Sequence, residues 1–134
     1  MGYLKLYGLT AVVFFAIDLV WLGAVAQGFY ARELGSLLRD RPLWPAALLF
    51  YALYIVGIVV FAVRPGLEAG SAGRAIGSGA LLGLIAYATF DLTCLALFRG
   101  FPVIVVVVDL IWGTVLTASV AAAAFGMGRW LEIT

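Results

Sequence analysis

The sequence has no histidine, one cysteine and few charged residues, and each shortage excludes a class of protein. Without histidine, the chain lacks the commonest general base and metal ligand of enzyme sites. Cys94 has no second cysteine with which to form an internal disulfide. Charged residues make up 11% of the 134 residues, against about 25% in soluble domains, and the net charge is only +1. Nucleic acid is therefore not an expected partner, because its binding requires a basic surface.

The chain is instead rich in apolar residues, at 66% of the total, which is more than the core of one small domain can hide. Runs of apolar residues predict four membrane spans, over residues 6–26, 43–63, 75–98 and 101–125. Only helices and closed barrels satisfy the backbone in lipid, and these runs are too long and continuous for barrel strands. The prediction is an all-α membrane protein, a four-helix transmembrane bundle that forms a single domain over residues 1–134.

The first apolar run has some features of a cleaved signal peptide. Lys5 would be its basic start, and Ala24-Val25-Ala26 matches the small-residue cleavage pattern. However, Asp18 and Trp21 fit poorly in the apolar core of a signal peptide. The sequence favours a retained helix, and hence a multi-pass membrane protein without a cleaved signal peptide.

The segment between the first two spans, residues 27–42, has an amphipathic pattern. Tyr30, Leu34, Leu37 and Leu38 share one helical face, and the charged residues lie mostly off it. This pattern predicts a short helix lying in the membrane interface, and a helical cap packed on the bundle is the alternative. Basic residues divide equally between the two sides of the membrane, so orientation is not fixed and dual topology stays open.

Small residues and prolines predict how the helices meet and end. Gly73-x-x-x-Gly77 and Gly79-x-x-x-Gly83 have the spacing that lets two membrane helices approach closely. Arg64-Pro65-Gly66 is expected to close the second span, since proline breaks a helix interior. Arg99-Gly100 predicts a tight turn, with Pro102 at the tolerated first position of the last helix.

Three carboxylic acids lie inside predicted spans, in AIDLVWLG, ATFDLTCLAL and VVVVDLIWGT, and no basic residue does. These residues are Asp18, Asp91 and Asp109. A central aspartate costs about 2.5–3.5 kcal/mol on insertion scales, and such residues nearly always face the bundle interior. Desolvation and mutual repulsion favour the neutral form, so we expect at least one to hold a proton near pH 7 unless a cation is bound.

The three carboxylic acids are predicted to share one depth. Counting from the span ends at 1.5 Å per residue places them, and Tyr51, about 10–12 Å below the same membrane face. Positions one helical turn away add aromatic side chains to this layer. The predicted proton- or ligand-binding candidates are Asp18, Asp91, Asp109, Tyr51, Tyr87, Trp21 and Trp112. A structural interpretation stands beside this one, with neutral aspartates as interhelical hydrogen-bond partners and tryptophans as packing residues.

The motifs that carry these residues resemble a known family. They are DLVWLG, FYARELG, LLFYALY, AYATFDLTCLA and DLIWGT, which together span essentially the whole chain. Their combination resembles the bacterial membrane-protein family catalogued as domain of unknown function 2177. The resemblance implies a four-helix protein of the bacterial inner (cytoplasmic) membrane and implies no particular reaction.

Three functional hypotheses follow. The first is binding or transport of a proton, a cation or a cationic small molecule by the acidic layer. The second is a lipid- or quinone-related enzyme or accessory protein, with Asp91 or Asp109 as general acid or base and Arg39, Arg41 and Arg99 holding an anionic head group. The third is a scaffold subunit of a membrane complex. No catalytic residue, metal or cofactor is assigned, and the expected partners are the lipid bilayer, a small cation or lipid, and a second copy of the chain.

Overall fold

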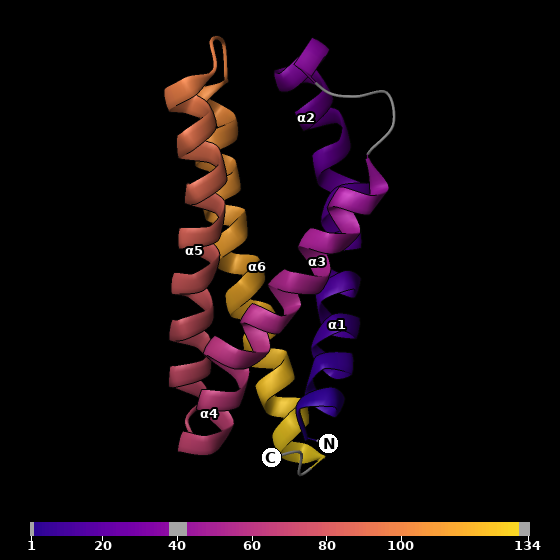
Figure 1. The fold of residues 1–134 in the computed structure, drawn as a ribbon, viewed down its shortest axis with the longest axis vertical. Helices are drawn as coiled ribbons and strands as arrows, with labels where there is room; N and C mark the ends of the chain where they lie inside the picture. Colours follow the sequence, from indigo (N-terminus) through magenta and orange to yellow (C-terminus); the bar gives the residue numbers. More distant parts are fainter. Residues whose placement is uncertain (1, 38–42, 132–134) are drawn as a thin grey trace.

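The computed structural model describes residues 2–37 and 43–131, and within these ranges the chain is built from helices joined by short turns. Four helices are long and apolar enough to cross a membrane: Gly2–Ala24, Trp44–Ala69, Ala72–Leu97 and Val103–Trp130. The predicted all-α membrane fold with four transmembrane helices is therefore confirmed. The first helix begins, and the last helix ends, at the same end of the bundle, as an even number of spans requires (Figure 1).

The first helix continues past its apolar run. α1 (Gly2–Val20) passes through a π-helical stretch, Trp21–Ala26, into α2 (Gln27–Leu34) and a 3-10 turn, Gly35–Leu37. The predicted helical segment between the first two spans is thus present, as an extension of the first helix (Figure 1). A π-helical stretch has wider turns, so it changes which face of the helix the following residues occupy. Leu38, the last residue of the predicted apolar stripe, lies outside the described residues.

The second long helix does not end at its proline. α3 (Trp44–Ile58) continues through a π-helical stretch, Val59–Val63, into α4 (Arg64–Ala69), so the expected stop at Pro65 is wrong. Proline lacks a backbone N–H and its ring clashes with an earlier carbonyl. Its position in the first turn of α4, directly after the π-helical stretch, avoids both problems. The helix ends instead at Gly70, whose φ of 62° is a left-handed conformation that favours glycine.

α5 (Ala72–Leu97) and α6 (Val103–Trp130) form a closely packed hairpin (Figure 1). A Cβ added to Gly79 would lie 2.9 Å from the Thr117 carbonyl oxygen, and one added to Gly83 would lie 2.7 Å from the Thr117 hydroxyl. Both distances are too short for a carbon, so the absence of side chains lets the two backbones approach. The prediction for this glycine pair is confirmed.

The other glycine pair on α5 has no such role. Nothing lies within 4 Å of a Cβ added to Gly77, and only the Ser71 hydroxyl, at 3.7 Å, approaches one added to Gly73. The prediction of close helix packing at this pair is wrong. The reason is helical periodicity, because at about 100° per residue Gly77 lies nearly opposite Gly79 on the helix.

The core lies mainly between α1, the second half of the α3–α4 helix, and α6. Phe14 and Ile58 are completely buried there, and the Tyr54 and Thr117 hydroxyls are hydrogen-bonded at 2.7 Å. α3 crosses the bundle diagonally, so that its start lies beside α1 while its continuation, Val59–Val63, packs on α5 (Figure 1). α3 and α5 therefore diverge toward the end of the bundle where α2 lies.

Candidate functional site

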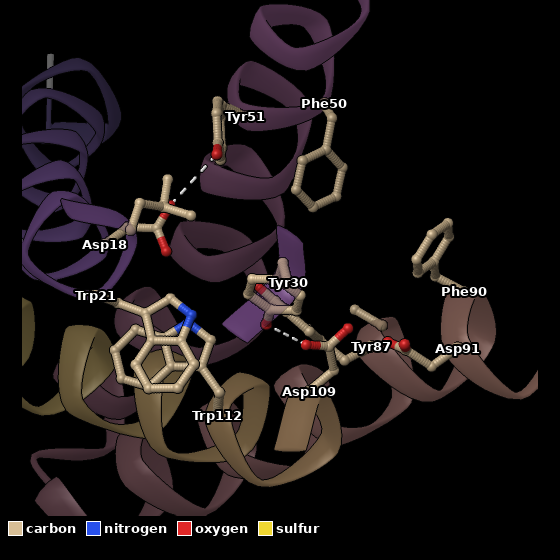
Figure 2. A pocket seen from close by; sticks show the side chains of 12 residues that line it. Asp18, Trp21, Tyr30, Phe50, Tyr51, Tyr87, Phe90, Asp91, Asp109 and Trp112 are labelled. Atoms are coloured by element: carbon tan, nitrogen blue, oxygen red, sulfur yellow. Dashed lines mark hydrogen bonds between the residues drawn. The ribbon is translucent and has the colours of Figure 1, made fainter. Parts of the chain in front are cut away.

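A cavity of about 380 Å³ lies in the region where α3 and α5 diverge. Its lining comes from all four long helices and from α2, and consists of Asp18, Trp21, Leu22, Tyr30, Phe50, Tyr51, Ala86, Tyr87, Phe90, Asp91, Asp109 and Trp112. Seven of these twelve residues are aromatic and three are aspartates. No basic residue is among the lining residues that the structure describes. The structure thus gathers all seven proton- or ligand-binding candidates around one space (Figure 2).

Asp18, on α1, is paired with a tyrosine of α3. The Tyr51 hydroxyl donates a hydrogen bond of 3.3 Å to Asp18 Oδ2. The Tyr51 ring is held edge-on by Phe14 and Phe15, with centroid distances of 5.7 and 5.4 Å. These contacts fix the tyrosine so that its hydroxyl points at the carboxylate, and they tie α1 to α3 at the wall of the cavity (Figure 2).

Asp91 and Asp109 bring two carboxyl groups together from α5 and α6 (Figure 2). Asp91 is 0% exposed, and neither of its carboxyl oxygens accepts a hydrogen bond from any donor among the described residues. Two adjacent carboxylates away from water cannot both carry full charge without a large electrostatic cost. A proton held between them, or a cation beside them, would remove that cost.

Tyr30 was not predicted as a site residue. It lies on α2, and its hydroxyl donates a hydrogen bond to Asp109 Oδ1 on α6 (Figure 2). Burial, and then the neighbouring Asp109, raise the pKa of the Tyr30 hydroxyl, so it remains a donor at physiological pH. In the sequence, Tyr30 belongs to the apolar face of the predicted helix in residues 27–42. This position predicted that the ring is buried, but it predicted no hydrogen-bond partner for the hydroxyl.

Trp21 and Trp112 form one wall of the cavity. Their rings are stacked, with centroids 4.3 Å apart and an interplanar angle of 11°. Trp21 belongs to the π-helical stretch after α1, and Trp112 lies one turn beyond Asp109 on α6. The stacked pair therefore joins the first and last helices beside the carboxyl groups (Figure 2).

Tyr87 occupies its position because α6 has a glycine opposite it. A Cβ added to Gly113 would lie 2.9 Å from the Tyr87 Cβ, with ring atoms closer still. The Tyr87 ring also lies edge-on to Tyr54, at a centroid distance of 6.4 Å. Gly113 thus provides the space that lets this aromatic side chain line the cavity.

Phe50 and Phe90 are further lining residues that the sequence did not predict. They are 46% and 60% exposed, so they stand at the edge of the cavity. Phe50 stacks on Tyr54 at 5.3 Å, and Phe90 lies edge-on to Phe101 at 6.4 Å. Phe50 is thus supported by a residue of its own helix, α3, and Phe90 by a residue of the turn that follows α5.

Residues 3–126 match the family described as "Predicted membrane protein (DUF2177)". The chain belongs to this family. Every residue that lines the cavity lies inside the matched range of the DUF2177 chain. The resemblance seen in the motifs is therefore confirmed, and with it a location in a membrane. No curated protein and no solved structure matches the chain.

Of the predicted head-group residues of this DUF2177 protein, Arg99 does not line the acidic cavity. Arg99 is exposed in the turn between α5 and α6 and lines a separate hollow of about 340 Å³ with Phe98, Phe101, Leu37 and Cys94. Arg39 and Arg41 lie outside the described residues. Over residues 2–37 and 43–131 the structure has no group of three or more side chains suited to hold a metal ion.

Proposed function

We propose that this protein binds a small organic cation within the membrane and exchanges it for a proton at the Asp91–Asp109 pair. The observation that carries the proposal is the environment of the Asp91 carboxyl group. This group is completely buried, faces the carboxyl group of Asp109, and accepts no hydrogen bond from the residues that the structure describes. An unpaired charge in such a place costs several kcal/mol. A bound proton offsets this cost in the empty protein, and a bound cation offsets it in the loaded one.

The aromatic lining supports an organic cation as the ligand. Trp21, Trp112, Tyr51 and Tyr87 surround the carboxyl groups, and no basic side chain competes among the described lining residues. Ammonium groups are attracted both to carboxylates and to the faces of aromatic rings, at about 0.5–2 kcal/mol for each ring contact. Acidic groups within an aromatic enclosure are the combination that binds amines and quaternary ammonium ions.

The volume of the cavity supports the same conclusion. At about 380 Å³ it is many times the roughly 30 Å³ that one water molecule occupies in the liquid. It falls in the range of small-molecule pockets, about 300–1,000 Å³. A bare sodium or potassium ion would leave most of this space unfilled.

The exchange follows from the groups that face Asp91. These are Asp109 from α6, Tyr30 from α2, and Tyr87 and Cys94 from its own helix, with Asp18 and Tyr51 across the cavity. The tyrosine hydroxyls and the thiol keep their protons near neutral pH, so the aspartates are the groups available to give up a proton. A cation that binds beside the pair favours its charged form and releases the proton. Release of the proton and the cation on opposite faces of a bacterial inner membrane would make this exchange a transport cycle.

The proposal is tested by measuring binding and proton release together. Purified protein is titrated with benzyltrimethylammonium in weakly buffered solution, with calorimetry for binding and a pH-sensitive dye for protons. We expect saturable binding with release of up to one proton per site, and little response to sodium or potassium. Asp91→Asn and Asp109→Asn should each weaken binding at least tenfold and abolish proton release.

Glu68→Gln is the matched control for these variants. Glu68 is an exposed carboxylate on α4, far along the chain from the cavity residues, and receives the same chemical change. It should bind the probe as the wild type does. If Asp18→Asn, Asp91→Asn and Asp109→Asn all leave binding and proton release at the level of Glu68→Gln, the acidic cavity is not an exchange site and the proposal is wrong.

A further inference from the structure

The cavity has an edge that faces the lipid. Phe50 on α3 and Phe90 on α5 line the cavity and are also exposed on the surface of the bundle. Both residues lie inside helices that are long and apolar enough to cross a membrane, so this surface meets hydrocarbon rather than water. The space beside the carboxyl groups is therefore connected to the side of the bundle.

The helices on either side of this edge do not close it. α5 packs on Val59–Val63, beyond the end of α3, whereas α3 itself packs on α1. The two phenyl rings are held apart by separate supports, Tyr54 for Phe50 and Phe101 for Phe90. In Figure 2 both rings lie on the side of the cavity away from the stacked tryptophans, with no other labelled side chain between them.

The end of the cavity near α2 is closed by a polar contact. Tyr30 lies over Asp109 and donates a hydrogen bond to it, so a ligand arriving from that end must first break this bond. Between Phe50 and Phe90, by contrast, the side chains of the described residues that a ligand meets are apolar rings. The route past Tyr30 and the route between Phe50 and Phe90 thus favour different ligands, because the route between the two phenyl rings admits apolar groups and disfavours hydrated ones.

We infer that the ligand is a lipophilic ammonium ion that reaches the carboxyl pair sideways from the membrane, between Phe50 and Phe90. This inference rests on the proposed function and adds the class of cation and its route. Such a cation sits at the membrane with its apolar part among the lipid tails. It enters with this part among the phenyl rings, and its charged group reaches Asp91 and Asp109, which lie next to Phe90 (Figure 2).

The test follows the rate of binding by stopped-flow tryptophan fluorescence in proteoliposomes. Trp44→Phe and Trp130→Phe, both at exposed positions, leave the stacked pair Trp21–Trp112 as the reporter. The probes are alkyltrimethylammonium ions of increasing chain length, with tetramethylammonium as the hydrophilic member. Because each methylene raises partition into the membrane roughly fourfold, the association rate should climb with chain length in the same proportion.

The route is tested by changing the width of the edge. Phe90→Ala should raise the association rate by about threefold or more, because the smaller side chain widens the edge. Phe90→Cys in a Cys94→Ala background, modified with a bulky maleimide, should slow both rates by at least about tenfold. Leu81, exposed on the same helix and outside the cavity lining, provides matched controls as Leu81→Ala and labelled Leu81→Cys.

The outcomes separate this inference from the function on which it rests. If both Phe90 variants match the Leu81 controls while Tyr30→Phe speeds binding, the ligand arrives past α2 and the lateral route is wrong. A Phe90→Ala variant that changes affinity at constant association rate would show the ring to be part of the binding wall, which also overturns the route. If Asp91→Asn binds the probes as tightly as the wild type, the proposed function itself fails.

Discussion

The Tyr30 hydroxyl and the Asp109 carboxylate, 79 positions apart in the chain, are joined by a hydrogen bond between α2 and α6. This contact places the segment after the first membrane helix over one end of the acidic cavity. It is a polar tie between the α1–α2 arm and the α5–α6 hairpin at that end of the bundle (Figure 2). The position of α2 therefore depends on this hydrogen bond.

Replacing Tyr30 with phenylalanine should release α2 from the hairpin. Loss of a hydrogen bond to a charged group costs about 1.5–3 kcal/mol when the acceptor is left buried. We expect faster hydrogen–deuterium exchange in α2, measured by mass spectrometry, with little change in α5 and α6. Tyr3→Phe removes a hydroxyl from an exposed tyrosine near the start of α1 and should leave exchange in α2 unchanged.

Loss of the Tyr30 proton should break the same contact only under alkaline conditions. Because the pKa of Tyr30 is raised by burial and by Asp109, the folded protein holds this proton more tightly than the unfolded chain does. The contribution of the contact to stability is then fully present below pH 10 and decreases as the pH rises above it. Exchange protection of α2 should be constant from pH 7 to about pH 10 and decline at higher pH. A loss of protection already between pH 7 and 9 would contradict this assignment.

The protonation of the carboxyl pair can be observed by infrared difference spectroscopy on the reconstituted protein. If Asp91 and Asp109 share a proton in the empty cavity, the absorption of a protonated carboxyl group should be present near neutral pH. Asp91→Asn should remove this absorption, and Glu68→Gln should retain it. Addition of benzyltrimethylammonium to the wild type should diminish it, and a spectrum unaffected by the cation would argue for a purely structural pair.

Alanine substitutions of α5 glycines should have opposite effects. Gly83→Ala places a carbon against Gly113 and Thr117, and such overpacking costs about 1–3 kcal/mol. Gly77→Ala meets nothing within 4 Å and should stabilise the helix by up to about 1 kcal/mol. The measurement is the midpoint of thermal unfolding in a mild detergent. Equal midpoints for the two variants would show that the α5–α6 hairpin is packed less closely than the structure indicates.

The sequence was sufficient for the fold and for much of the cavity lining because both depend on local rules. The lengths of the apolar runs predicted the four helices, and the constant rise per residue predicted one depth for Asp18, Asp91, Asp109 and Tyr51. Buried carboxyl groups must face the interior, so a shared depth implied a shared space. The structure adds that the Tyr51 hydroxyl is directed at Asp18.

The remaining features depend on the path of the chain in three dimensions. Tyr30 reaches Asp109 because the helix continues through a π-helical stretch, which no hydrophobic period reveals. Phe50 and Phe90 stand at the edge because α3 crosses the bundle diagonally, and a crossing angle is not encoded in apolar length. The helix passes Pro65 because a π-helical stretch precedes it, where proline alone predicted a stop.

The close packing of α5 on α6 has a consequence for how the cavity can change shape. Asp91 and Asp109 are carried by two helices whose backbones interlock through Gly79, Gly83 and Gly113, so they move as one rigid unit. Any widening of the cavity must then come from the arm formed by α1, α2 and α3, which carries Asp18 and the Tyr30 hydroxyl that donates to Asp109. The distance between Asp91 and Asp109 stays constant while their surroundings change, so the protein alters the affinity of a fixed charge centre by moving Asp18 and the Tyr30 hydroxyl relative to it.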